Sequence, residues 1–76
     1  MIKIKLKIIS HLIYKTGFGE RDLELPQPVA IEELLTKINL ENKIPMVIIR
    51  NGKVVDLKEQ VQDGDRIVIS PFFFGG

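Results

Sequence analysis

The sequence predicts an α+β fold: a mixed sheet of four to five strands with one main helix packed on one face. Three observations lead to this prediction. The first residues alternate strictly between aliphatic and lysine, one amphipathic helix lies mid-chain, and tight-turn signals separate short apolar runs near the end. The 76 residues are enough for one small domain.

The first strand is expected over residues 2–8, where isoleucines and a leucine alternate with lysines. A period of two places the aliphatic side chains on one face and the ammonium groups on the other. The following loop is expected to hold one helical turn near residues 12–14. A second strand over residues 21–25 then pairs with the first as a hairpin, and Pro26 and Pro28 end it.

The helix is expected from about Ile31 to about Asn39. Its apolar residues recur at i, i+3, i+4 and i+7, which is the stripe of an amphipathic helix, and two glutamates in the first turn suit its dipole. Ala30 stands at the N-cap position, where a side-chain acceptor is expected. Its absence predicts a cost of about 1 kcal/mol.

The remaining strands follow turn signals. Residues 46–50 form a third strand, Asn51-Gly52 predicts a tight hairpin back through residues 53–55, and residues 57–61 hold a short turn. Asp63-Gly64 makes another turn before the last strand, residues 66–70. In that strand Ile67 and Ile69 share one face, and Val68 and Ser70 share the other.

This order of elements, a hairpin followed by a helix and then by strands that complete the sheet, predicts a β-grasp arrangement. The first and last strands then lie side by side in the middle. We divide the chain into a β-grasp domain, residues 1–70, and an extended C-terminal tail, residues 71–76.

The tail is the candidate functional segment. It consists of Pro71, Phe72, Phe73, Phe74, Gly75 and Gly76. Gly-Gly has no Cβ to clash in a narrow channel, and it reaches backbone angles closed to other residues. We therefore expect the carboxylate of Gly76 to be a chemical handle that the domain holds out. The alternative is a frayed end that happens to be glycine.

Composition narrows the other classes of function. There is no cysteine and the net charge is +1, so a thiolate metal site is excluded and a basic nucleic-acid surface is disfavoured. No apolar run approaches the roughly 20 residues of a membrane span, and the N-terminus has no signal-peptide pattern. His11, the one histidine, has no catalytic constellation near it in the sequence. We expect a soluble cytoplasmic protein without bound metal or cofactor.

The whole chain resembles the small ubiquitin-like sulfur carriers, namely the small subunit of molybdopterin synthase and the sulfur carrier of thiamine biosynthesis. The resemblance rests on residues 2–8, residues 12–17, Leu23-Glu24-Leu25-Pro26, residues 30–35, residues 61–67, and Pro71 with the terminal Gly75-Gly76. Asp63-Gly64-Asp65, a strand and Gly-Gly at this spacing form its most specific part.

The resemblance implies that the chain is a protein cosubstrate rather than an enzyme, although it can count as the small subunit of a synthase. A ubiquitin-activating-type enzyme would use ATP-Mg to adenylate Gly76, with Gly75 keeping the tail thin. Sulfur from a sulfurtransferase or cysteine desulfurase would then give a thiocarboxylate. The acceptor partner would be a molybdopterin synthase large subunit or a thiazole synthase.

Partner contacts are expected at two places. Phe72, Phe73 and Phe74 would anchor the tail in an apolar groove, each contributing about 2–3 kcal/mol if fully buried, although Phe73 could instead continue the inward row of the last strand. Val68 and Ile48 are expected on the outer face of the sheet. Two other functions stay open: a protein modifier conjugated through Gly76, and a β-grasp interaction module whose terminus has no chemistry. The receiving pathway and the oligomeric state are also open.

Overall fold

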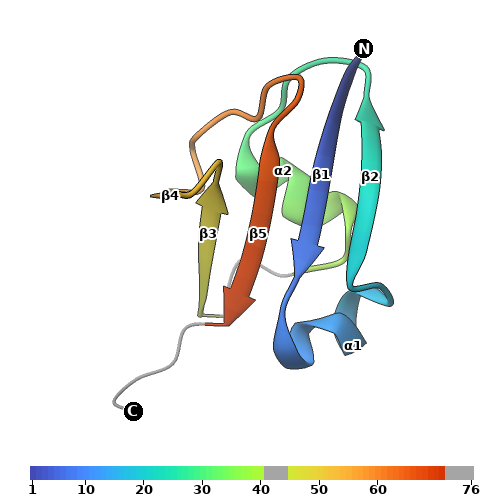
Figure 1. Ribbon diagram of the computed structural model, residues 1–76, viewed down its shortest axis with the longest axis vertical. Coiled ribbons are helices and arrows are strands. Elements are labelled where there is room, and N and C mark those ends of the chain that lie inside the picture. The colour runs from blue at the N-terminus through green and yellow to red at the C-terminus, as the bar shows by residue number, and fades with distance from the viewer. Residues whose placement is uncertain (41–44, 72–76) are drawn as a thin grey trace.

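The computed structural model describes residues 1–40 and 45–71. These residues form a five-stranded sheet in the order β2-β1-β5-β3-β4, with helix α2 lying across one face (Figure 1). The strands are β1 (Ile2–Ile8), β2 (Glu20–Leu25), β3 (Met46–Arg50), β4 (Lys53–Val55) and β5 (Arg66–Pro71). The helices are a 3₁₀ turn (Ser10–Leu12), α1 (Ile13–Thr16) and α2 (Ile31–Lys37).

The topology confirms the β-grasp prediction. β1 pairs antiparallel with β2 and parallel with β5, so the first and last strands are neighbours in the middle of the sheet. β3 pairs antiparallel with β5 and with β4. The turn between β3 and β4 is Asn51-Gly52, with φ of 51° and 85°, as the hairpin signal predicted.

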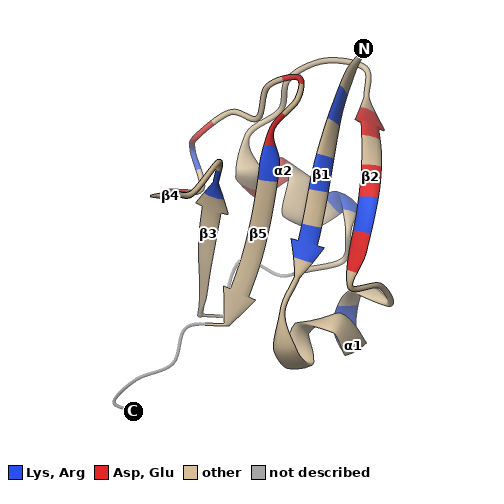
Figure 2. Ribbon diagram, viewed as in Figure 1, with Lys and Arg blue, Asp and Glu red and all other residues tan. Residues whose placement is uncertain are grey.

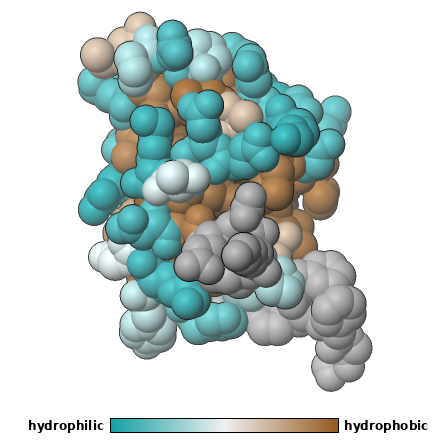
Figure 3. Space-filling model, turned by 180° about the vertical axis from the view of Figure 1, so that it is seen from behind, coloured by the Kyte–Doolittle hydropathy of each residue, from teal (hydrophilic) through white to brown (hydrophobic). Residues whose placement is uncertain are grey.

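The core lies between the sheet and α2. Burial along β1 alternates strictly, with every aliphatic residue buried and every lysine exposed. The buried hydrophobic residues are Ile2, Ile4, Leu6, Ile8, Leu12, Leu25, Val29, Ile31, Leu34, Leu35, Ile38, Leu40, Ile48, Val61, Ile67 and Ile69. On the helix side of the molecule, polar residues surround a hydrophobic area that is visible near the middle (Figure 3).

The N-terminus of α2 is capped by the main chain of a distant loop. Ala30 makes no side-chain cap. Instead, the N–H groups of Ile31 and Glu32 donate to the carbonyl oxygens of Glu59 and Leu57, at 2.9 and 3.1 Å. The loop thus satisfies helix donors that Ala30 leaves without a side-chain acceptor, and it ties the start of α2 to the segment before β5.

Three boundaries differ from the prediction. β2 begins at Glu20, one residue earlier than expected. α2 ends at Lys37 rather than near Asn39, because Asn39 adopts a φ of 63°, a left-handed conformation in which a helix stops. β5 continues through Pro71 instead of stopping before it. Proline lacks an N–H, but at the last position of a strand this costs little of the ladder.

Candidate functional site

β5 holds the base of the tail at the centre of the sheet. It lies between β1 and β3, and its inward residues Ile67 and Ile69 are almost fully buried. Pro71, its last residue, is buried and lies opposite Met46 of β3. β5 is therefore paired on both sides as far as Ile69, and its last residue, from which the chain continues toward Gly76, is paired with β3.

The predicted tail residues lie outside the described part of the structure. This applies to the reactive pair Gly75 and Gly76 and to the anchoring residues Phe72, Phe73 and Phe74. Their roles stay predictions, as does the division of the chain into domain and tail.

Val68 and Ile48 were both predicted on the outer face, which is the face opposite α2, and the structure confirms only one of these placements. Val68 is half-buried and lies there, between Lys7 of β1 and Ile49 of β3. The placement of Ile48 on this face is wrong: Ile48 is 3% exposed and pairs with the inward residue Ile69. Residues 47–49 are all aliphatic, so alternation along β3 does not reveal which of them points inward.

Other apolar residues lie on the outer face where Ile48 was expected, and together they form an outer apolar patch. It consists of Val47, Ile49, Val54 and Val68. Register pairs Ile49 with both Val68 and Val54, and Val54 is 72% exposed. The patch spans β5, β3 and β4, and β5 is the strand that leads to the tail. Exposed apolar surface of this kind marks interaction sites.

The other half of the outer face is formed by β1 and β2, whose charged residues are coloured in Figure 2. The lysines of β1 lie opposite an acidic row on β2, because the register pairs Lys3 with Glu24, Lys5 with Asp22 and Lys7 with Glu20. Arg66 of β5 lies beside Lys5. The one ion pair across β1 and β2 within the described residues joins Lys3 and Glu24 at 3.6 Å, and exposed pairs of this kind contribute little to stability.

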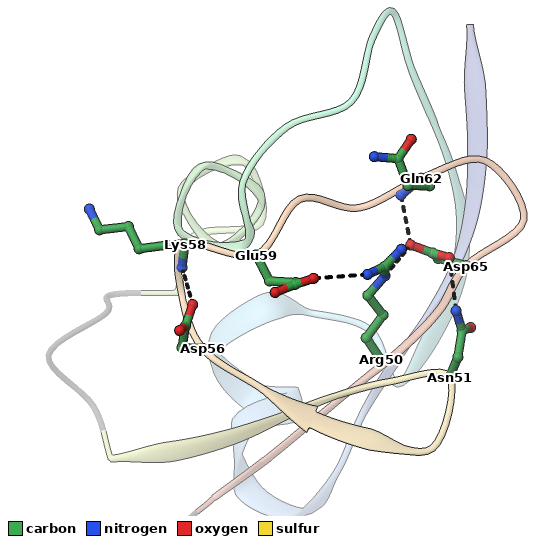
Figure 4. A network of polar contacts seen from close by, with 7 residues as sticks. All are labelled: Arg50, Asn51, Asp56, Lys58, Glu59, Gln62 and Asp65. Atoms are coloured by element: carbon green, nitrogen blue, oxygen red, sulfur yellow. Dashed lines mark hydrogen bonds and ion pairs between the residues drawn. The ribbon is translucent and has the colours of Figure 1, made fainter.

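A polar cluster fixes the start of β5, at the end opposite the tail (Figure 4). Its centre is Asp65, the buried charged residue of the described chain, which is 5% exposed. Its carboxylate accepts hydrogen bonds from Arg50 Nε at 2.6 Å, Asn51 Nδ2 at 2.9 Å and the Gln62 N–H at 2.6 Å. Arg50 also bonds Glu59 at 3.2 Å, so the cluster joins the β3–β4 turn to the loop before β5.

The cluster determines the charge state of Asp65. Burial by itself would raise the pKa of this carboxyl. The hydrogen bonds from Arg50, Gln62 and Asn51, together with the positive charge of Arg50, outweigh burial and hold the pKa below its ordinary value. Asp65 is therefore an ionised structural anchor and is poorly suited to exchange protons near neutral pH.

Sequence reasoning used Asp63-Gly64-Asp65 only as a turn and as part of a resemblance. It missed Asp65 as an anchor because its partners Arg50 and Asn51 are distant in sequence. The described residues place no three His, Cys, Asp or Glu side chains where they could hold a metal ion. None of their helices is long and apolar enough to cross a membrane.

The fold matches solved structures of small β-grasp proteins. A protein named molybdopterin converting factor, subunit 1, from Pyrococcus furiosus aligns with a TM-score of 0.77 at 22% identity, over 93% of this chain and 98% of its own. Small archaeal modifier protein 1 from Haloferax volcanii gives a TM-score of 0.76 at 16% identity, over 93% and 98% of the two chains. The thiamine biosynthesis protein ThiS from Geobacter metallireducens gives 0.62 at 20% identity, over 95% and 99%.

These structures and the geometry above define the class: a ubiquitin-like β-grasp protein whose last strand is held at the centre of the sheet. The model of the ThiS family matches residues 6–76, which is nearly the whole chain. The protein belongs to the ThiS family and is a small ubiquitin-like sulfur carrier. A comparison with curated protein sequences gives no match.

Proposed function

We propose that this carrier transports sulfur as a thiocarboxylate on Gly76. The observation that carries the proposal is the position of β5, which is paired on both sides and leads directly into the tail sequence. A partner needs only to grip the end of the chain, because the domain holds the base of the tail in one place.

The chemistry divides into two steps, both catalysed by partners. The Gly76 carboxylate attacks the α-phosphorus of ATP and releases pyrophosphate, which leaves an acyl adenylate. The terminal sulfur of a persulfide then displaces AMP, and cleavage of the resulting acyl disulfide by a thiol leaves the thiocarboxylate. The small protein contributes position, and the partner site contributes electrostatics and the exclusion of water.

The domain also offers a surface for the adenylating partner. Val68, together with Val47 and Ile49 of the outer apolar patch, lies on the central and neighbouring strands that lead to the tail. A partner that covers this patch while it grips the tail would bury apolar area at two connected places, which favours a fixed orientation.

Mass spectrometry tests the thiocarboxylate directly. The full chain is incubated with an adenylating enzyme, ATP-Mg and a persulfide source, and a mass gain equal to the exchange of one oxygen for one sulfur is expected. A chain without Gly76 serves as the control and should not change. Pyrophosphate exchange into ATP monitors the adenylation step separately. If the chain is adenylated but gains no sulfur, only the second step is contradicted. If every adenylating partner fails to activate Gly76, the proposal is contradicted.

Conjugation to proteins is the second candidate function. It is favoured by the match to small archaeal modifier protein 1, whose name describes a modifier. The same activated Gly76 would then be attacked by a lysine amine, giving an isopeptide bond. A ladder of higher-mass species on immunoblots that disappears when Gly76 is removed would support it.

Identifying the protein that co-purifies with the carrier would show which pathway accepts the sulfur. The matches to a molybdopterin converting factor subunit and to a thiamine biosynthesis protein correspond to the two pathways expected from sequence. Co-purification with a synthase large subunit would favour the pterin pathway, and co-purification with a thiazole synthase would favour the thiamine pathway.

A further inference from the structure

β2 forms one edge of the sheet, and within the described residues it pairs only with β1. The N–H of Ile8 donates to the carbonyl of Gly19 at 2.7 Å, which fixes the phase of the antiparallel ladder. Because hydrogen-bonded and non-hydrogen-bonded pairs alternate, every second residue of β2 turns its N–H and C=O toward the outer edge. These residues are Glu20, Asp22 and Glu24.

The side chains of the same three residues form the acidic row on the outer face. A strand that docked on this edge would hydrogen-bond to their main chain. It would place its own opposite side chains on the outer face, beside carboxylates. Opposite charge is favoured at such cross-strand positions, so the incoming side chains there are lysine or arginine.

On the side of the β2 edge that faces α2, a docked strand would meet a different surface. A groove of about 280 Å³ lies there, between β2 and the C-terminal end of α2. Leu23, Phe18 and Ile38 contribute its apolar lining. Arg21 lies 4.2 Å from the centre of the Phe18 ring, and Lys37 lines the groove as well. Inward-facing residues of a docked strand therefore meet apolar surface and two cations, which disfavours lysine or arginine and favours aliphatic side chains.

We propose that the β2 edge and this groove together form a binding site for an extended segment of a partner protein, with basic and aliphatic residues alternating. β1 shows that β2 accepts such a strand, because β1 presents lysines to the acidic row and buries its aliphatic residues. A second copy of β2 does not fit this site, since antiparallel pairing would bring two acidic rows together. The proposal does not depend on the tail or on its sulfur chemistry.

A peptide copying residues 3–7, blocked at both ends, is a suitable probe. It is titrated into the ¹⁵N-labelled full chain and followed by amide chemical shifts and hydrogen exchange. The expected result is saturable shifts at Glu20, Asp22 and Glu24, with slower exchange of their amides. A peptide with glutamate in place of each lysine should bind about tenfold more weakly, because three favourable cross-strand charge pairs become repulsive.

Variants at Asp22 separate main-chain pairing from simple charge attraction. Asp22→Pro and Asp22→Ala both lose the carboxylate, but only Asp22→Pro also loses an outward N–H that β1 does not use. Asp22→Pro should therefore bind about three- to tenfold more weakly than Asp22→Ala, the effect of one hydrogen bond. Asp22→Lys should also weaken binding, whereas Glu33→Lys, which changes the net charge equally on exposed α2 surface, should not. Amide spectra of each variant verify the fold.

Several outcomes would overturn the proposal. They are the absence of shifts along β2 at millimolar peptide, equal binding of the glutamate peptide, or shifts centred on the outer apolar patch. Equal binding by Asp22→Pro and Asp22→Ala would also overturn it, because the attraction would then be electrostatic without strand pairing.

Discussion

Replacing Asp65 with alanine should destabilise the domain strongly, because it removes a buried acceptor at the centre of a polar cluster. Three donors lose their partner: Arg50 Nε, Asn51 Nδ2 and the Gln62 N–H. The Asn51 side chain also accepts a hydrogen bond from the Arg66 N–H at 2.8 Å. The variant therefore disturbs both the β3–β4 turn and the start of β5.

The magnitude follows from the burial of the partners. Breaking a buried ion pair costs about 3–5 kcal/mol when one charge is left without a partner. The Arg50 side chain is 22% exposed and keeps Glu59 as a partner, so the lower end of this range applies. We expect a loss of about 3 kcal/mol, out of a total stability of about 4–11 kcal/mol for a domain of this size. At about 4–8 °C per kcal/mol, the melting temperature should fall by 12 °C or more.

Urea denaturation followed by circular dichroism measures this loss. Asp22→Ala is the matched control, because Asp22 is exposed on the edge strand, and it should change the free energy of unfolding by about 0.5 kcal/mol at most. If Asp65→Ala lowered the free energy of unfolding no more than Asp22→Ala does, the cluster would not anchor β5.

The same cluster predicts a pH dependence. A carboxyl whose pKa is lower in the folded than in the unfolded chain stabilises the fold above its unfolded pKa, about 4 for aspartate, and this contribution is lost as the pH falls through the folded pKa. The difference in stability between the wild type and Asp65→Asn should therefore be constant from pH 7 to about 5 and narrow below about 4. A difference that grew toward low pH would contradict the assigned direction.

Three further predictions concern the core, a turn and the sheet edge. Leu6→Ala, at a fully buried position of β1, should cost about 2–5 kcal/mol in urea denaturation, and a loss under about 1 kcal/mol would contradict the central packing of β1. Gly64→Ala should cost only about 1–2 kcal/mol, the strain of a side chain at a φ of 84°, because no atom lies within 4 Å of the added Cβ. Hydrogen exchange should be slow for the amide of Leu23 and fast for that of Asp22; equal protection would contradict the deduced phase of the ladder.

The regular elements could be predicted because local pattern decides them. In β1 the alternation of aliphatic and lysine residues matches burial position by position, and Asn51-Gly52 set the hairpin. The central pairing of the first and last strands followed from the order of elements. These features depend on periodicity and turn chemistry, which act over a few residues.

The remaining features depend on contacts between distant residues. Arg50 has the same parity in β3 as Ile48 and pairs with the inward residue Ile67, so a charged residue lies on the core side of the sheet. It can do so because Asp65 and Glu59 neutralise it there. The sequence does not show these partners, and the aliphatic run before Arg50 does not show that Ile48 shares its inward face. The capping of α2 by Leu57 and Glu59 was hidden for the same reason.

The parallel pairing of β1 with β5 has a consequence for biosynthesis. β1 pairs with the nearby β2 on one side, but its other partner, β5, comes much later in the chain, so the centre of the sheet cannot close until β5 has left the ribosome. Nascent chains that stop before β5 lack the central strand of the sheet. The centre of the sheet, from which the tail sequence continues, is therefore the last part of the fold to be completed.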